Sequence, residues 1–239
     1  GPGLEEPASL MVAQGEVVGV FGLVGAGRSE MLRILFGASP ARGGEVKVRG
    51  RTVRISSPKE AIRAGVMLCP EDRKKDGLIA ILSVLENLNI TARRHYTRMG
   101  FVINSAWEQE NARAQIDRLD IRTTSMYQLA GSLSGGNQQK VILARWLSED
   151  IKVLLLDEPT RGVDVGAKKE IYALIYDLAR RGVGVLMVSS ELPEVLGVTD
   201  RILVMRQGGL VASLMRSEAT EEEVLRLALP ETPVAGGPA

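Results

Sequence analysis

The sequence predicts an α/β domain with a mainly parallel core sheet, a partial antiparallel layer and an inserted helical subdomain. Three observations predict this fold. Apolar runs with the length of buried strands, such as 153–156 and 183–188, alternate with amphipathic helices. A glycine-rich turn joins an apolar strand to a helix near the start of the chain. The polar stretch 83–146 is mostly helical in pattern, so we predict that it forms the inserted subdomain.

The elements before residue 83 follow from apolar spacing and turn residues. They are a strand at 15–22, a helix at 29–36, short strands at 45–49 and 53–55, a helix at 57–64 and a buried strand at 66–69. Gly50 and Arg51 are predicted to form the turn between the two short strands. Residues 1–3 have the composition of a linker or cloning remnant and are left out of the fold prediction.

The elements after the helical stretch alternate between strand and helix. They are a strand at 152–156, a helix at 166–181, a strand at 183–189, a helix at 191–196, a strand at 201–205 and a terminal helix at 220–229. We expect residues 1–229 to form one domain and the Pro-, Gly- and Ala-rich residues 230–239 to be disordered.

Composition excludes several classes of protein. The chain has 239 residues, of which 45% are hydrophobic and 25% charged, as in globular domains. Its formal net charge of +1 gives no basic field that would attract nucleic acid. Cys69 is the only cysteine, which excludes an intrachain disulfide. No apolar run approaches the roughly 20 residues that span a bilayer, so any work at a membrane requires docking on another subunit.

The first chemical motif is the sequence GLVGAGRS at residues 22–29, here called the phosphate loop. It matches G-x-x-x-x-G-K-[ST] except that Arg28 stands in place of lysine. Glycines let backbone N–H groups surround phosphate oxygens at a helix N-terminus, and Ser29 offers a hydroxyl to Mg²⁺. The alternative is a plain glycine turn. The predicted nucleotide-binding residues here are Gly22, Leu23, Val24, Gly25, Ala26, Gly27, Arg28, Ser29 and Glu30.

The second motif places two acids at the end of the buried strand 152–156. Asp157 is predicted to hold the water shell of Mg²⁺, and Glu158 to polarise the attacking water as a catalytic residue. The alternative is a strand that ends in solvated acids. Because ligands bind beyond the carboxyl ends of parallel strands, we expect these acids and the phosphate loop to share one site.

The third motif is LSGGNQQK at residues 133–140. It resembles the LSGGQ signature of the ABC ATPase family, with Asn137 in place of glutamine. The resemblance implies a P-loop NTPase fold of the ABC type. In that family the segment contacts the γ-phosphate of ATP bound to the opposite domain of a head-to-tail dimer. A simple helix cap is the alternative. The residues assigned to this contact are Ser134, Gly135, Gly136, Asn137 and Gln138.

The same resemblance assigns three further positions. Glu71 stands where the family has a glutamine that touches Mg²⁺ and the transporter interface, and is the third predicted metal contact. Asp164 corresponds to the family's D-loop and is assigned to nucleotide binding. Ser190 occupies the position of the catalytic switch histidine. The only histidine, His95, is predicted to be a surface residue of the helical stretch.

Four longer segments resemble one particular group within the ABC ATPase family. Residues 65–77, 133–140 and 156–168 are similar to the second half of the fused ATP-binding subunits of bacterial monosaccharide importers, and residues 87–94 resemble the arabinose-importing members. The resemblance implies ATP and Mg²⁺ as cofactors. It also implies an N-terminal ABC domain of the same subunit and transmembrane permease subunits as partners. The resemblance further implies a periplasmic sugar-binding protein as an indirect partner, no nucleic-acid partner, and a location at the cytoplasmic face of the bacterial inner membrane.

The departures from the family pattern suggest a division of labour. Arginine is planar and bulkier than lysine, so Arg28 is not a conservative replacement. Arg28 and Ser190 each remove a group that stabilises the transition state. We therefore expect this pocket to bind ATP but hydrolyse it poorly, while the signature segment completes the partner domain's site. The alternatives are a regulatory pseudo-ATPase and, disfavoured by the +1 charge and the short insert, a soluble ABC ATPase acting on nucleic acid.

Overall fold

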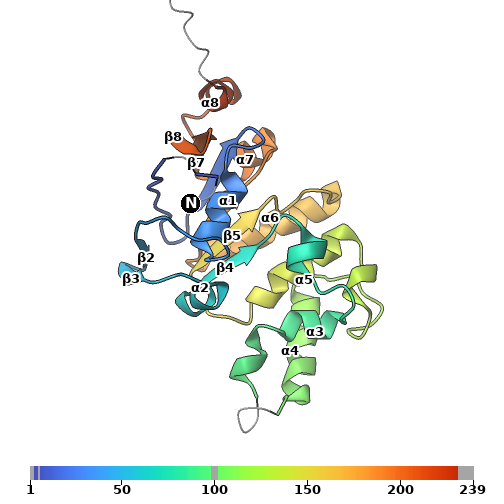
Figure 1. The fold of residues 1–239 in the computed structure, drawn as a ribbon. Coiled ribbons are helices and arrows are strands. Elements are labelled where there is room, and N and C mark those ends of the chain that lie inside the picture. The colour runs from blue at the N-terminus through green and yellow to red at the C-terminus, as the bar shows by residue number, and fades with distance from the viewer. Residues whose placement is uncertain (1–2, 5, 98–101, 231–239) are drawn as a thin grey trace, which may run out of the picture.

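The computed structural model describes residues 3–4, 6–97 and 102–230, and a six-stranded sheet runs through it (Figure 1). The strand order is β4-β5-β6-β1-β7-β8. The strands are β1 (Val17–Gly22), β4 (Val66–Cys69), β5 (Val153–Asp157), β6 (Gly184–Val188), β7 (Arg201–Arg206) and β8 (Gly209–Met215). All neighbouring pairs are parallel except β7 with β8, which confirms the predicted mainly parallel sheet.

The parallel strands form because helices cover both faces of the sheet, so continuous apolar runs can be buried. Every residue of β1, β4 and β6 is buried. Val17 and Val185 belong to the hydrophobic cluster that includes α6 (Val165–Arg180). Val18 and Leu186 belong to the cluster on the other face, which includes α1 (Arg28–Leu35).

The register brings the ends of three strands together. Asp157 of β5 pairs with Val188 of β6, and Val188 also pairs with Val20 of β1. The loops that follow β1, β5 and β6 therefore leave the sheet at the same edge. These loops carry the phosphate loop, Glu158 and Ser190.

The predicted helical stretch contains α3 (Val84–Asn89), α4 (Ser105–Arg118), α5 (Gly135–Trp146) and two short 3-10 helices, η2 (Ala92–His95) and η3 (Ala130–Ser132). Figure 1 shows α3 and α4 at one end of the molecule, away from the sheet. A capping box of Ser83 and Glu86 starts α3. At the end of α5, Trp146 Nε1 donates a hydrogen bond of 3.1 Å to the Leu68 carbonyl, which ties this region to β4.

Two hairpins differ from the prediction. The strands β2 (Val46–Val48) and β3 (Arg51–Val53) are joined by Arg49 and Gly50, so the predicted turn at 50–51 and strand at 53–55 were each displaced. Both turn residues have positive φ, which suits a two-residue hairpin and leaves Arg51 free to pair. The β7–β8 hairpin was not predicted, although its turn repeats this pattern with Gln207 and Gly208.

The remaining helices are α2 (Pro58–Ala64), α7 (Leu192–Val198) and α8 (Glu221–Ala228). A π-helical turn, η1 (Arg73–Gly77), was not predicted. The residues predicted to be a disordered tail lie, from 231 onward, outside the described residues, as do residues 1 and 2. Within the described part of the chain, every helix is too short or too polar to cross a membrane.

Candidate functional site

The phosphate loop connects the buried strand β1 to helix α1. Gly25 and Gly27 have φ values of 83° and 89°, which favour glycine. A Cβ at Gly22 would lie 2.5 Å from the Met205 carbonyl oxygen, so this position also requires glycine. Val24 at the crest is 95% exposed, and the space around Gly25 is open. The loop therefore presents the backbone of residues 23–25 to solvent, whereas Ala26, Gly27 and Arg28 at the N-terminus of α1 are buried. A Cβ at Gly27 would clash with the Gly3 carbonyl oxygen, so the N-terminal segment lies against the position where a phosphate would bind.

Ala26 inside this loop and Glu30 directly after it each contact another segment of the chain. Ala26 donates its backbone N–H to Leu23, at 3.0 Å, and its carbonyl accepts from Gly208, at 3.1 Å. Glu30 is exposed on α1 and lies against Gly3. A Cβ added at Gly3 would lie 2.6 Å from the Glu30 Cγ. Glu30 therefore faces the N-terminal segment.

Arg28 is turned into the protein. Its side chain is 10% exposed, and Nη1 donates a hydrogen bond of 2.6 Å to the Ser189 carbonyl. The same atom lies 3.5 Å from Glu158 Oε1. The guanidinium thus binds the loops that follow β5 and β6, and in this state it is withdrawn from the solvent side of the phosphate loop.

Ser29 and Asp157 lie together, as the sequence predicted. Ser29 Oγ donates a hydrogen bond of 2.9 Å to Asp157 Oδ1. Burial raises the pKa of Asp157 to about 6; the negative charge of Glu158 adds to the rise, and the Ser29 hydrogen bond opposes it. Hydroxyl and carboxylate oxygens are the ligands that Mg²⁺ prefers, and a dication would stabilise the ionised carboxyl. These two residues therefore fit Mg²⁺.

Glu158 lies in the left-handed backbone region, with φ of 48°. Its N–H donates to the Val188 carbonyl at 3.0 Å, which fixes the carboxylate at the strand edge. Glu158 Oε2 accepts a hydrogen bond of 3.1 Å from Ser190 Oγ. With Arg28 beside Oε1, both carboxylate oxygens of Glu158 have a protein neighbour. Ser190 therefore lies beside the predicted catalytic acid.

The signature segment, residues 133–138, forms the start of α5. Ser134 is the N-cap, and its Oγ accepts a hydrogen bond of 2.9 Å from Asn137 Nδ2. Gly136 packs so closely that a Cβ would lie 2.7 Å from the Ala167 Cβ. Gln138 is buried and donates to the carbonyls of Gly131 and Leu133, so its side chain holds the loop before α5.

Asp164 caps α6 beside this segment. Its Oδ1 accepts a hydrogen bond of 3.0 Å from the Ala167 N–H, and this bond lowers the pKa of the exposed Asp164 carboxyl. Ser134, Asn137 and Asp164 line one surface pocket of about 210 Å³. The structure thus brings the signature segment and the predicted D-loop residue to one face.

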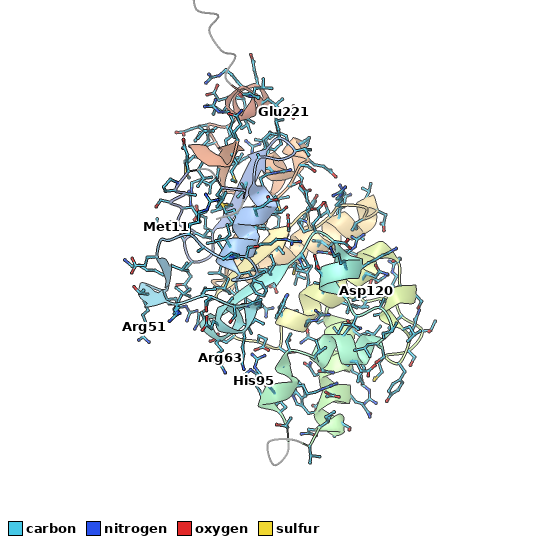
Figure 2. The ribbon with its side chains drawn as sticks, in the orientation of Figure 1. Met11, Arg51, Arg63, His95, Asp120 and Glu221 are labelled. Atoms are coloured by element: carbon cyan, nitrogen blue, oxygen red, sulfur yellow. The ribbon has the colours of Figure 1, made fainter. Side chains whose placement is uncertain are left out.

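Glu71 follows β4 at the sheet edge that carries the acids, because Cys69 pairs with Leu156, whereas His95 lies in η2, outside this edge. Glu71 forms an ion pair with Arg161, on the loop between Thr160 and Asp164, so its carboxylate is engaged there. Figure 2 shows His95 in the helical part of the molecule, where its Nε2 lies 3.2 Å from Glu149 Oε2. Its side chain is half exposed, as expected for a surface residue.

Sequence reasoning missed a buried acid behind the site. Glu194 accepts a hydrogen bond of 2.7 Å from Thr160 Oγ1 and a second from Ser189 Oγ. These hydroxyls belong to the loops that carry Glu158 and Ser190, so Glu194 joins the two loops. The sequence did carry a signal for this residue: Glu194 is the third residue of a short helix whose other residues are mostly apolar.

Known proteins resemble this chain over nearly its whole length. The family model described as "ABC transporter" matches residues 6–161. The chain is 58% identical over 232 residues to the arabinose import ATP-binding protein AraG of Pectobacterium atrosepticum, covering 97% of this chain and 46% of that protein. It is 55% identical over 229 residues to AraG of Vibrio parahaemolyticus, covering 96% and 45%. The chain thus spans about half the length of the curated relatives it matches.

Solved structures share the fold. A dimeric bacterial ABC transporter cassette superposes with a TM-score of 0.76 at 22% identity, covering 90% of each chain. A nucleotide-free ATP-binding cassette from an ABC transporter gives a TM-score of 0.79 at 23% identity, covering 96% of this chain and 93% of the other.

Proposed function

Since this chain belongs to the ABC transporter family, we propose that it is an ATP-binding domain that energises import of a monosaccharide, with arabinose favoured. The observation that carries the proposal is the identity of 55% to 58% to proteins named for arabinose import, over nearly the whole chain. The enzyme class is an ABC-type sugar-transporting ATPase. The phosphate loop, the acids Asp157 and Glu158 at the end of β5 and the signature segment supply the three parts that such an enzyme needs.

The proposed assembly has several parts. Residues 1–229 form one nucleotide-binding domain, with a helical subdomain at about 83–146. It pairs with an N-terminal ABC domain of the same subunit, and this proposal is supported by relatives of about twice its length. Transmembrane permease subunits bind this pair at the cytoplasmic face of the inner membrane, and a periplasmic sugar-binding protein delivers the sugar to them.

In the proposed site, ATP phosphates bind the backbone of the phosphate loop at the N-terminus of α1. Ser29 and Asp157 would hold Mg²⁺, which neutralises phosphate charge when bound. Asp157 must be ionised to do so, and Glu158 orients the attacking water. Ser190 donates a hydrogen bond to Glu158 and thereby keeps its carboxylate in one orientation.

We propose that this pocket itself hydrolyses ATP poorly. Arg28 gives a hydrogen bond to the Ser189 carbonyl and faces Glu158, so ATP must compete with both for its guanidinium. Ser190 has a hydroxyl that already donates to Glu158, and it lacks the imidazole found at this position in the family. Loss of a single group that stabilises the transition state commonly lowers the rate by about 100-fold or more.

The signature segment is the domain's proposed catalytic contribution. Ser134 and Asn137 share a surface pocket with Asp164, and the N-terminus of α5 opens onto this face. A phosphate supplied by the partner domain would find a hydroxyl and backbone N–H groups there. This domain then completes the partner's ATP site.

The proposed permease-docking surface combines Glu71, η1 and the adjoining helical subdomain. Ile81 is 81% exposed, and Tyr127 and Leu129 are exposed on the neighbouring strand-like segment. The two segments are joined by a hydrogen bond from the Ala130 N–H to the Leu82 carbonyl, at 2.9 Å. Exposed apolar side chains gathered on adjacent segments are typical of a protein-binding surface.

The test measures ATP turnover by the full-length subunit that contains this chain, assembled in lipid vesicles with its permease and its sugar-binding protein, in the presence of arabinose. Arg28→Ala should retain most of the turnover, whereas replacing the phosphate-loop lysine of the partner domain with alanine should abolish it. The division of labour is wrong if Arg28→Ala abolishes turnover as fully. The sugar assignment is wrong if another pentose, and not arabinose, stimulates turnover.

A regulatory pseudo-ATPase is the second candidate, and the contact of Arg28 with Glu158 favours it. Such a domain binds ATP without turnover, and its nucleotide only stabilises the assembly. The two are separated by measuring ATP affinity on this chain, and hydrolysis on this chain mixed with a partner domain whose own phosphate-loop lysine is replaced with alanine. A Glu158-dependent residual rate supports the enzyme, and tight binding with no rate above that of Glu158→Gln supports the pseudo-ATPase.

A further inference from the structure

The π-helical turn η1 lies along the signature helix α5 and is attached to it near the end at Gly77. The Gly77 carbonyl accepts a hydrogen bond of 2.7 Å from Arg145 Nη1. A Cβ at Gly77 would lie 2.7 Å from the Ile142 Cδ1, so the turn and the helix are in direct contact. Arg145 also donates to the Asn87 carbonyl, at 2.9 Å, which extends the connection to α3.

At its other end, η1 presents the side chain of Arg73. Its Nη1 donates a hydrogen bond of 2.9 Å to the Arg161 carbonyl. Its Nη2 lies 3.1 Å from the position of a Cβ at Gly135 and 3.5 Å from that of a Cβ at Gly162. One guanidinium therefore lies against the first residue of the signature helix and against the loop that follows Glu158.

The Arg73 guanidinium is half-buried, where its positive charge is less favourable than in solvent. Burial lowers the pKa of Arg73 by disfavouring its charge. The N-terminus of α5 is the positive end of that helix, so a neighbouring cation is repelled. A guanidinium offers five N–H donors in a rigid plane and can contact two segments together, whereas an ammonium is a point charge.

We propose that Arg73 is a positioning residue that fixes residues 134–136 and the loop at 161–162 to the η1 turn. A partner that displaces η1 then moves both segments together. The functional part of this inference rests on the proposed function, because it takes the signature segment to contact the partner domain's nucleotide. The structural part depends only on the contacts of Arg73, Arg161 and the two glycines.

The first test measures amide hydrogen exchange on this chain without nucleotide. Arg73→Ala should speed exchange at 134–138 and 161–164 by about tenfold, with exchange in the core strands unchanged. Arg63→Ala, at an exposed arginine of α2, is the matched control and should change neither segment. Unchanged exchange at both segments in Arg73→Ala overturns the proposal. If Arg73→Ala does not fold, Arg73→Lys must show the same local change, and wild-type exchange in it overturns the proposal.

The second test measures ATP turnover in the full-length subunit. Arg73→Ala should lower kcat by about tenfold and change KM for ATP by less than about twofold, because positioning acts on the transition state. Arg63→Ala should match the wild type. Faster exchange with normal kcat overturns the functional part alone. A wild-type subunit without any ATP turnover contradicts the proposed function, while the exchange result still decides the structural part.

Discussion

Asp157 has a buried carboxyl at the edge of the sheet, and its pKa of about 6 links the site to stability. In the unfolded chain this group ionises near its ordinary value of 3.8. A raised pKa means that the folded state binds the proton more tightly than the unfolded state. As pH rises from about 4 to about 6, the metal-free fold therefore loses stability, and the full cost remains at higher pH.

Asp157→Asn should remove this cost and retain an oxygen that accepts from Ser29. We expect the free energy of unfolding without metal to rise by about 2 kcal/mol at pH 8 and to match the wild type near pH 4. Urea denaturation at the two pH values measures it. Asp164→Asn is the control, because backbone N–H groups already stabilise that ionised carboxyl; it should show no gain at pH 8. Equal stability of Asp157→Asn and wild type at pH 8 contradicts the prediction.

Arg28→Lys tests whether the inward contacts of Arg28 limit nucleotide binding. A lysine ammonium cannot reproduce the planar contacts with the Ser189 carbonyl and Glu158, so its charge becomes available to phosphate. Freeing one charged hydrogen bond of about 1.5 kcal/mol should tighten MgATP binding roughly tenfold. Calorimetric titration of this chain measures the affinity. Arg28→Ala should bind more weakly than the wild type, and a Lys variant that binds no more tightly contradicts the account.

These two residues also illustrate what sequence could predict at the site. The contact of Ser29 with Asp157 follows from strand order, because Asp157 ends β5 and the phosphate loop that carries Ser29 follows β1 at the same sheet edge. The inward orientation of Arg28 depends on a backbone carbonyl 161 positions later and on the left-handed conformation of Glu158. No local pattern encodes either condition.

At the scale of elements, burial on both faces made the parallel strands predictable. The strand at 66–69 has the predicted bounds, and α6 begins one residue before its prediction. Turns were harder, because the β2–β3 hairpin depends on positive φ at Arg49 as well as Gly50. The η1 turn has no apolar period; the Asp72 side chain starts it by accepting from the Lys74 and Lys75 N–H groups.

Helix α7 offers a prediction about glycine. Gly197 lies inside this helix, is exposed, and has open space where a Cβ would be. Gly197→Ala should raise the free energy of unfolding by about 0.5–1 kcal/mol, because alanine restricts the unfolded chain. Gly19→Ala is the contrasting variant: its Cβ would lie 2.6 Å from the Val195 Cγ1, so it should destabilise the fold. Thermal and urea unfolding measure both, and a loss of stability in Gly197→Ala would refute the argument.

At the scale of the whole molecule, the proposed function divides the chain into two half-sites. The phosphate loop and acids lie at the edge of the parallel sheet, whereas the signature segment starts α5 and shares a pocket with Asp164. Sequence predicted these parts separately. In the proposed function, the phosphate loop of one domain works with the signature segment of the other, which requires a partner domain. Relatives of about twice this length are consistent with such a partner.

If the proposed N-terminal ABC domain is the partner, mixing it with this chain should give a one-to-one complex only with MgATP. Light scattering after size-exclusion chromatography measures its mass. Gly135→Asp should prevent the complex, because it places a carboxylate beside the incoming phosphate and crowds the Gly162 carbonyl, 3.0 Å from the added Cβ. Gly43→Ala, with open space around it, is the control. Association that is independent of nucleotide contradicts the shared-site model.

The contact between Arg28 and Glu158 has one more consequence, for the response to ionic strength. Glu158 already lies beside Arg28 as a counter-anion, so a phosphate that binds Arg28 replaces one anion with another beside the same cation. Added salt screens the attraction between opposite charges. Here it weakens the Arg28–Glu158 pair and the Arg28–phosphate pair that replaces it to a similar degree. The affinity of this pocket for nucleotide should therefore vary little with salt, and its occupancy should follow the ATP concentration of its surroundings.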